Sequence, residues 1–505
     1  MSESRWVDAG LSGGGWVVDP VASTREDGFG QIEATSIQAE PLTLISKKPN
    51  AGPMLNLITR ALGGDLPELT KDALGMFTRL AREGNGVVPL RIGPRQAFLV
   101  SDPERIRHVL LENASQYDKD TPAFRAVRVA LGNGLLTSSG EFWKRQRRIA
   151  QPAFHGENLK RFAPIFSRLA DQCADQWEAT HRAGQPVDAG TDMMKATLSG
   201  VAEALFGEDL SAQAAEINRV FPTILQELAH RARSPIPLPL WIPSPGNRQL
   251  HAALGTIEQI VDEMIRRRRD RLDAIAAEPS VRRDLLSTLM LAKDEETGES
   301  MSDQQLHDEV MTLLIAGHET TANALSWVWY LLDRHPDEQE RIREELRAVT
   351  GGRPPTVEDL PRLHRLRMVF LEALRLYPPV WLFDRRALAP DRLGDTVIQP
   401  GNLVLICPYA IHRIESLWPD PEAFRPERFE HGKEQQKNKF AFLPFGAGPR
   451  MCMGMSFAMM ESQILLGTLV GRFRTRLWNP DSLLAKPQVT LRPDRPVLLR
   501  LESLS

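Results

Sequence analysis

Hydrophobic residues recur at helical spacing along most of the chain, and strand-like runs are confined to three places. Residues 86 to 102, "GVVPLRIGPRQAFLVSD", predict two short strands around a Gly-Pro turn, followed by a helix that begins at Pro103. Further strands are predicted within residues 395 to 407 and 488 to 501, where β-branched residues and leucines flank turn residues. The pattern therefore predicts a mainly α protein with a small β-sheet, an α+β fold.

The longest predicted helix begins at Ser302 and runs to about His335, just before Pro336. Ser302 and Gln305 have the spacing of a capping box. Roughly 33 residues at ~1.5 Å each would reach ~50 Å, which is right across a domain of this size. In its middle, "AGHETTANA" combines Gly317 with two adjacent threonines, residues that disfavour a helix interior. Such a local conflict marks a candidate functional site.

The chain divides into a short tail and one large domain. Residues 1 to 45 are rich in Gly, Ser, Asp and Glu and lack a sustained hydrophobic period, so they predict a flexible tail. Residues 46 to 505 show no repeat of fixed period, and no block within them separates as a second domain. We therefore expect a single large domain built around the long central helix.

Composition and charge narrow the range of functions. The 62 Lys and Arg residues nearly balance the 65 Asp and Glu residues, which argues against nucleic acid as a partner. Three cysteines are too few for a disulfide framework or a cysteine-rich zinc site. The N-terminus has no signal-peptide pattern, and no apolar run reaches the ~18 residues of a membrane span. These features predict a soluble, cytoplasmic protein without a transmembrane segment.

One cysteine, Cys452, lies in the glycine-rich loop "FGAGPRMCMG", residues 445 to 454. An apolar helix pattern follows it directly, so its thiolate would lie at the positive end of a helix. Gly446, Gly448 and Gly454 allow a sharp turn and the close approach of a flat ligand, and Arg450 could pair with a carboxylate of that ligand. Taken alone, the loop is also compatible with a glycine-rich turn around a buried, inert cysteine.

Three motifs together resemble the cytochrome P450 family of haem-thiolate monooxygenases. The cysteine-loop pattern Phe-x-x-Gly-x-Arg-x-Cys-x-Gly is met at every fixed position, by Phe445, Gly448, Arg450, Cys452 and Gly454. The long-helix motif of the family is met by Ala316, Gly317, Glu319, Thr320 and Thr321, and its Glu-x-x-Arg motif by Glu372 and Arg375. The motifs occur in the family's order, and the resemblance covers residues 46 to 505, with the features of soluble, bacterial-type members.

The resemblance implies haem b (iron protoporphyrin IX) as the cofactor, with Cys452 as the proximal iron ligand. Its other implied cofactor-binding residues are Trp143, Arg147, Ala316, Arg385, Phe445, Arg450 and Gly454. Of the adjacent pair in "FDRRALAP", Arg385 is favoured over Arg386 for binding a haem propionate. Cys173 and Cys407 are expected to pack in the core.

Thr320 and Glu319 are the implied catalytic residues, because dioxygen must receive protons before its O–O bond breaks. The Thr320 hydroxyl can bond to the carbonyl four residues earlier, that of Ala316, and so loosen the helix. Glu319 would relay protons from solvent. Elsewhere, Glu372 and Arg375 share a helix face, and the resemblance favours a buried structural network with Arg428 over an exposed ion pair.

The implied activity is insertion of one oxygen atom of O2 into a hydrophobic organic substrate of the lipid, terpenoid, steroid or polyketide class. Electrons would come from NAD(P)H through a separate ferredoxin or flavodoxin-type donor with its reductase. A peroxide-using haem-thiolate enzyme and a non-catalytic haem-binding sensor are the alternatives. The resemblance offers eight candidates for the lining of the substrate pocket, each of which could equally be a plain core residue: Phe124, Leu135, Met311, Leu314, Ile315, Val380, Trp381 and Leu382.

Overall fold

The computed structural model describes residues 64–154, 156–234, 237–272, 284–293, 298, 300–432 and 439–504. The predicted flexible tail, residues 1 to 45, and the predicted start of the large domain at residue 46 lie outside the described residues. Within them, helices predominate and the strands form several small sheets, so the α+β prediction is confirmed. No helix of this part of the chain is long and apolar enough to cross a membrane.

The helices and strands have the following bounds. The helices are α2 Leu66–Lys71, α3 Ala73–Glu83, α4 Pro103–Arg107, α5 Pro122–Leu131, α6 Gly140–Ala150, α7 Gly156–Lys160, α8 Ala163–Arg182, α9 Ala189–Phe206, α10 Ala214–Arg233, α11 Pro245–Asp270, α13 Leu285–Leu291, α14 Asp303–Arg334, α15 Pro336–Thr350, α16 His364–Leu376, α17 Pro408–Ile411 and α19 Met455–Arg472. The strands are β1 Val87–Ile92, β2 Arg95–Val100, β3 Tyr117–Asp118, β4 Val187–Asp188, β5 Phe383–Ala387, β6 Asp391–Leu393, β7 Thr396–Ile398, β8 Leu403–Ile406, β9 Phe473–Leu477, β10 Ala485–Pro487, β11 Leu491–Pro493 and β12 Leu498–Ser503.

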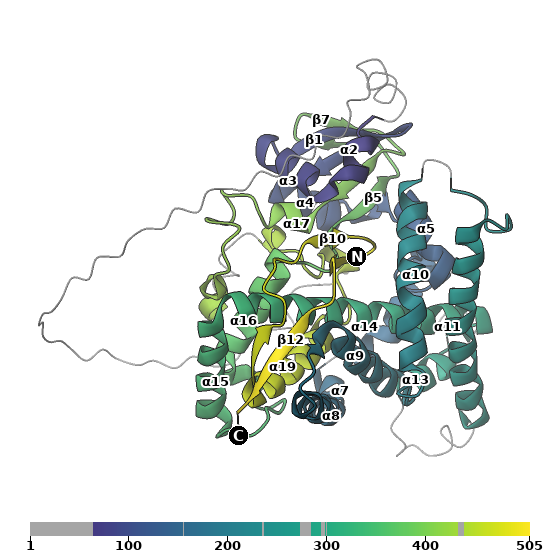
Figure 1. Ribbon diagram of the computed structural model, residues 1–505. Helices are drawn as coiled ribbons and strands as arrows, with labels where there is room; N and C mark the ends of the chain where they lie inside the picture. Colours follow the sequence, from purple (N-terminus) through teal and green to yellow (C-terminus); the bar gives the residue numbers. More distant parts are fainter. Residues whose placement is uncertain are drawn as a thin grey trace, which may run out of the picture. The chain divides into compact units, whose positions relative to one another are not determined.

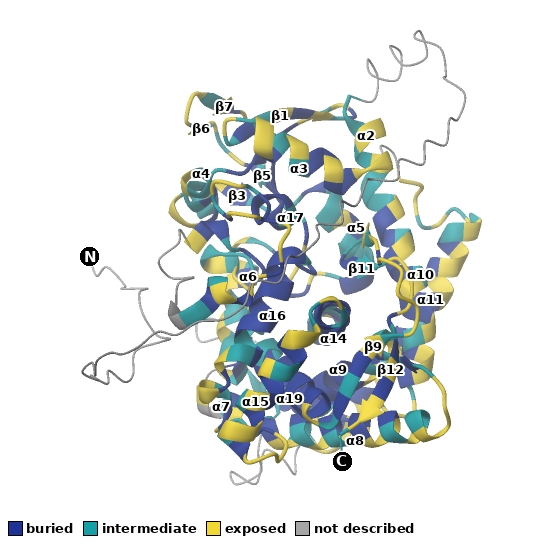
Figure 2. Ribbon diagram, turned by 60° about the vertical axis from the view of Figure 1, so that its left-hand side comes forward, coloured by how far each residue is buried: buried dark blue, intermediate teal, exposed yellow. Residues whose placement is uncertain are grey.

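Helix α14 is the predicted long helix, and it lies in the interior with other helices around it (Figure 2). Both bonds of its capping box are present: the Ser302 hydroxyl accepts from the Gln305 N–H at 3.2 Å, and the Gln305 side chain accepts from the Ser302 N–H at 2.9 Å. The helix ends at Arg334, two residues before Pro336. The caps read from the sequence therefore set both ends of the element that crosses the core.

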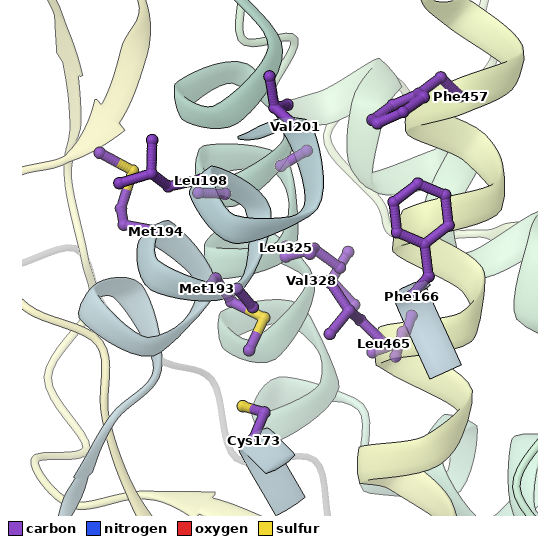
Figure 3. Close-up of a cluster of buried hydrophobic side chains, with 14 of the residues drawn as sticks. Phe166, Cys173, Met193, Met194, Leu198, Val201, Leu325, Val328, Phe457 and Leu465 are labelled. Carbon is purple, nitrogen blue, oxygen red and sulfur yellow. The ribbon is translucent and has the colours of Figure 1, made fainter. Parts of the chain in front are cut away.

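The main core forms where α8, α9, α14 and α19 meet, and Figure 3 shows their side chains pointing toward one another. Phe166 of α8 packs edge-on against Phe457 of α19, with ring centroids 4.9 Å apart. Gly317 of α14 faces Val201 of α9, and a Cβ at position 317 would come within 2.7 Å of a Val201 methyl group. The glycine in the middle of the long helix therefore has a packing role, because it permits the close approach of α9.

The largest sheet has the strand order β1-β2-β8-β5-β3 and lies with α2, α3 and α4 on one side of α14 (Figure 1). Its pairings are antiparallel except for β2 with β8, which run parallel with Ala97 opposite Leu403. Strand β5 is paired on both sides, by β8 and β3, which fixes the direction of Arg385 and Arg386. The strands predicted near residues 86, 395 and 488 are all present.

A buried ion-pair network joins α16 to the segment before the cysteine loop. Arg375 donates to both oxygens of Glu372, at 2.7 and 2.8 Å, and both side chains are fully buried. Arg428 donates to Glu372 at 3.2 Å, and Arg375 also donates to the carbonyls of His412, Pro421 and Ala423. The network predicted from the Glu-x-x-Arg motif is therefore confirmed as structural and buried.

Replacing Glu372 by alanine should destabilise the protein strongly, because it leaves Arg375 and Arg428 without their carboxylate inside the protein. We expect the free energy of unfolding to fall by about 3–5 kcal/mol, measured by urea titration followed by circular dichroism. Glu216→Ala is the matched control, since it removes an exposed partner of Arg219 and should cost less than about 1 kcal/mol. Equal losses in the two variants would contradict a structural role of the network.

Candidate active site

All of the site residues predicted from the sequence line one cavity of about 560 Å³. They come from α6, α14, β5 and the loop that precedes α19, elements far apart in the chain. The residues brought together are Trp143, Arg147, Ala316, Glu319, Thr320, Arg385, Phe445, Arg450, Cys452 and Gly454. The fold therefore gathers the cysteine loop and the long-helix motif around a common space, whereas Glu372 and Arg375 of the third motif do not line it.

The cysteine loop is held by its own backbone and by a close neighbour. The Cys452 N–H donates to the Phe445 carbonyl at 2.9 Å, which closes the loop. Gly446 and Gly448 adopt φ of +68° and +71°, a region that disfavours other residues. At Gly448 a Cβ would come within 1.9 Å of the Leu110 carbonyl oxygen, so only glycine lets the loop pack against this turn.

The Cys452 side chain has an exposed surface, and that surface faces the cavity, where protein surrounds it. Burial raises the pKa of its thiol, while the Gly454 backbone N–H and the charge of Arg147 act in the opposite direction. Helix α19 begins just after Gly454, so the sulfur also lies near its positive end. A metal cation in the cavity would add to these effects, and the position therefore suits a thiolate ligand.

Four cations line this part of the cavity: Lys119, Arg147, Arg385 and Arg450. Burial lowers the pKa of Arg450 to about 9, with further contributions from the charges of Arg385 and Arg147. Burial likewise lowers the pKa of Arg385 to about 10, and it takes that of Lys119 well below its ordinary value, assisted by the three arginines. Like charges gathered in a buried place favour anions as ligands.

Two of these cations have neutral partners that fix their direction. The Arg450 guanidinium stacks on the Trp143 ring at 3.7 Å, while its Nη1 is buried and has no hydrogen-bond partner among the described residues. Arg147 Nη1 donates to the Met451 carbonyl at 3.1 Å, next to Cys452. Because a buried guanidinium nitrogen requires an acceptor, the arrangement fits a bound group that carries carboxylates beside the cysteine. Haem, with two propionates, has these features.

The sequence did not single out Lys119. Its Nζ donates to the Leu136 carbonyl at 3.0 Å and lies 4.8 Å from the centroid of the Phe124 ring. Tyr117, Lys119 and Thr121 are all buried, whereas the two aspartates between them are less so. This strand-like alternation was the one signal in the sequence that could have placed Lys119 inside. It is hard to recognise, because the three buried positions carry an aromatic ring, a cation and a hydroxyl instead of a run of apolar residues.

Arg385 and Arg386 point to opposite faces of β5, as successive residues of a strand do. Arg385 lines the cavity, whereas Arg386 pairs with Asp118 at 2.5 Å and with Asp120 at 2.9 Å. The choice of Arg385 as the cavity residue agrees with these positions.

Helix α14 presents Ala316, Gly317, Thr320 and Thr321 to the cavity. The Thr320 hydroxyl donates to the Ala316 carbonyl at 2.9 Å, the back-bond anticipated from the sequence, and Thr321 donates to the Gly317 carbonyl at 3.2 Å. A hydroxyl that donates its hydrogen to a carbonyl in this way can still accept a hydrogen bond at its own oxygen. The Ala316–Thr321 stretch therefore offers two hydroxyl groups to the cavity, those of Thr320 and Thr321.

Glu319 borders the cavity, and its carboxylate is engaged by neighbours. It accepts from Thr490 at 2.5 Å and from Asn323 at 3.1 Å, and Arg492 lies 3.8 Å away. Burial raises the pKa of Glu319, although these three partners favour its charged form. Glu319 therefore joins the cavity wall to the hairpin that carries Thr490 and Arg492.

Six of the eight residues predicted to form the substrate pocket line the cavity: Phe124, Leu135, Ile315, Val380, Trp381 and Leu382. The prediction was wrong for Met311 and Leu314, which are buried in the core on another face of α14. The helix instead turns Thr312 and Leu313 toward the cavity, one turn before Ala316 and Gly317. The sequence did not reveal which face of α14 turns toward the cavity, because apolar residues occur on both faces of this part of the helix.

Comparison with known proteins agrees with this geometry. The family model for cytochrome P450 matches residues 60–500. Cyclooctatin synthase of Streptomyces melanosporofaciens is 38% identical over 85% of this chain and 91% of its own length. Cyclooctat-9-en-7-ol 5-monooxygenase of the same organism is 36% identical (82% and 87% covered), and pentalenene oxygenase of Streptomyces avermitilis is 31% identical (82% and 89% covered).

The chain belongs to the cytochrome P450 family, since the match covers nearly its whole length. It is a haem-dependent monooxygenase that acts on a hydrophobic substrate with dioxygen and redox partners.

The contact between Gly448 and Leu110 can be tested without any ligand. Gly446→Ala should lower the free energy of unfolding by roughly 1–2 kcal/mol, the cost of a left-handed alanine, because nothing lies within 4 Å of the added methyl group. Gly448→Ala has the same backbone cost and also collides with a carbonyl, so we expect a loss of about 4 kcal/mol or more. Urea unfolding measures both variants, and equal losses would show that the contact with Leu110 does not constrain the loop.

Proposed function

We propose that Cys452 ligates the iron of haem b and that the enzyme oxygenates a terpenoid or other lipid-like substrate held between Cys452 and helix α14. The observation that carries the proposal is the shared cavity, which has a lone cysteine on one wall, the α14 hydroxyls on another and four cations beside the cysteine. The names of two relatives support the substrate class, because they describe oxygenation of cyclooctat-9-en-7-ol and of pentalenene.

The cysteine side of the cavity would hold and orient the cofactor. Cys452 offers a thiolate that the Gly454 N–H and the start of α19 favour, and Arg450 and Arg385 offer guanidinium groups for the propionates. Trp143 fixes the direction of Arg450, so the charge reaches the cavity rather than the outer surface. Bound haem supplies the activation of dioxygen, for which a thiolate ligand favours cleavage of the O–O bond.

On the opposite wall, α14 would control protons. Thr320 Oγ1 donates to the Ala316 carbonyl, so its lone pairs can accept a proton or hold a water molecule at the cavity surface. Thr490 and Asn323 hold the Glu319 carboxylate in place, and this carboxylate would exchange protons with the outside through the Thr490 hairpin. The apolar remainder of the wall would exclude bulk water and bind the substrate skeleton.

Helix α6 would present the docking surface for a small acidic electron donor of the ferredoxin or flavodoxin type. Lys144 and Arg148 are exposed on this helix, whose Arg147 reaches the Met451 carbonyl beside Cys452. A basic surface so close to the ligand loop would steer an acidic donor toward the cofactor by the shortest route.

The ligand assignment predicts a specific optical signature. The dithionite-reduced protein should give a strongly red-shifted Soret band with carbon monoxide, and Cys452→Ser should abolish it. Cys173→Ser should keep the band, since Cys173 packs in the core away from the cavity. An unshifted band in the unaltered protein, or a red-shifted band that persists in Cys452→Ser, would contradict the proposal.

Thr320→Ala should uncouple oxygenation from electron consumption, because the hydroxyl facing the cavity is lost. We expect product formed per NAD(P)H to fall by roughly tenfold or more, with hydrogen peroxide released instead. Thr320→Ser should retain most of the coupling. Ser326→Ala is the control and should keep it, since the Ser326 hydroxyl also bonds back along α14, to the Ala322 carbonyl at 2.8 Å, but does not line the cavity. Unchanged coupling in Thr320→Ala would remove the residue from proton delivery.

A further inference from the structure

Two more cations line the cavity besides the four near Cys452: Arg95 at the start of β2 and Arg233 at the end of α10. Two carboxylates border the same space, and both have partners: Glu319 with Thr490 and Asn323, and Asp384 with the Thr121 hydroxyl at 2.9 Å. The two propionates of haem would be matched by the four cations beside the cysteine. Arg95 and Arg233 are then charges without a counterpart among the described residues or in the cofactor.

Arg233 is largely unsatisfied within the described chain. Its Nη2 donates to the Pro487 carbonyl at 2.6 Å, and this is the one hydrogen bond that its side chain makes with the described residues. Burial lowers the pKa of Arg233, and no charged group among the described residues contributes to this shift. A guanidinium has five N–H donors in a planar fork, which leaves most of them available to a ligand in the cavity.

Arg95 is half-buried, and its side chain makes no hydrogen bond or ion pair with the described residues. It follows the β1–β2 turn, opposite Ile92 in the strand register, and both residues line the cavity. Because this arginine faces an apolar cavity and no carboxylate of the described chain pairs with it, its guanidinium can bind an anionic ligand.

A series of contacts links the elements that carry the two arginines. Pro487, the partner of Arg233, precedes Gln488, whose carbonyl accepts from the Trp381 indole at 3.0 Å. Trp381 packs against Phe77 of α3, with ring centroids 6.2 Å apart, and α3 lies against β2, which begins at Arg95. The end of α10 and the β1–β2 pair lie on the same side of α14 (Figure 1).

Apolar side chains of α2, α3 and β1 line the same cavity, together with Trp381. They are Leu66, Leu69, Ala73, Phe77, Ile92 and Trp381. A ligand in this cavity would therefore meet a hydrocarbon surface as well as cationic groups, an arrangement that suits an amphipathic anion.

We infer that Arg95 and Arg233 bind a carboxylate in the cavity, and that the substrate is an amphipathic acid, a carboxylate on an apolar skeleton. The inference rests on the proposed function, because it directs the skeleton toward Cys452 and α14 once the carboxylate is bound. Planar guanidinium groups match a carboxylate in geometry as well as in charge. The two arginines would thus select the substrate and set which end of it reaches the reaction centre.

The test compares acids with neutral analogues of the same skeleton by isothermal titration calorimetry on the purified, haem-loaded full chain. Dodecanoic acid is paired with dodecanol, and abietic acid with its methyl ester. At neutral pH and low salt, at least one acid should bind roughly tenfold or more tightly than its neutral partner. Salt should reduce this preference, because the pair is partly exposed to solvent.

Arg233→Gln and Arg95→Gln should each reduce the preference several-fold, and together they should abolish it, while leaving the affinity for the neutral analogue unchanged. A purely structural role would weaken both ligands equally. Arg219→Gln on α10 and Arg91→Gln on the β1–β2 pair remove the same charge from the same elements outside the cavity, and should change neither affinity.

The inference is overturned if neither acid is preferred by the unaltered protein, or if the preference survives in the double variant. The carbon monoxide spectrum of the same samples separates this outcome from failure of the proposed function. A red-shifted band without acid preference refutes the carboxylate site alone, whereas an unshifted band refutes the haem-thiolate assignment whatever the calorimetry shows. If the double variant fails to fold, the unaltered protein still tests the inference. Equal binding of the acid and its neutral analogue overturns it, and so does a preference for the acid that salt does not reduce.

Discussion

The accumulation of positive charge around a single cysteine is the constraint on which the site depends. Lys119, Arg147, Arg385 and Arg450 come from four separate segments and repel one another in a place that water reaches poorly. Neutral groups hold them in position: the Trp143 ring under Arg450, the Leu136 carbonyl at Lys119 and the Met451 carbonyl at Arg147. Such partners orient a cation without neutralising it, so the cluster keeps its attraction for an anionic ligand beside the thiolate.

That arrangement is possible because the surrounding scaffold is rigid at two points. The Glu372–Arg375–Arg428 network fixes the segment that leads into the cysteine loop, through donors to three backbone carbonyls as well as to the carboxylate. On the other wall, Gly317 lets α9 pack closely against α14 and so sets the position of Thr320 relative to the cavity. A haem-thiolate enzyme must hold the cysteine loop and the long helix at a fixed separation. The Glu372 network acts on the first of these walls, and the contact of Gly317 with α9 acts on the second.

The sequence was a reliable guide where the chemistry is local. The capping box at Ser302, the left-handed glycines of the cysteine loop and the Thr320 back-bond all involve residues within a few positions of each other, and each occurs as the spacing indicated. It was a poor guide to which side of the long helix faces the cavity. Met311 and Leu314 lie in the core, because apolar residues occur on more than one face of this part of α14 and its rotation depends on what packs against it.

The sequence by itself determined the fold class, through the hydrophobic periodicity along the chain, and the cysteine loop with its motif residues, through spacing along one segment. Only the tertiary structure decided which distant side chains share the cavity. Lys119 joins the cationic cluster through strand alternation, and Arg95 and Arg233 line the same cavity although well over a hundred residues of chain separate them. The charge balance of a cavity is a property of all its walls together, and no single stretch of sequence contains it.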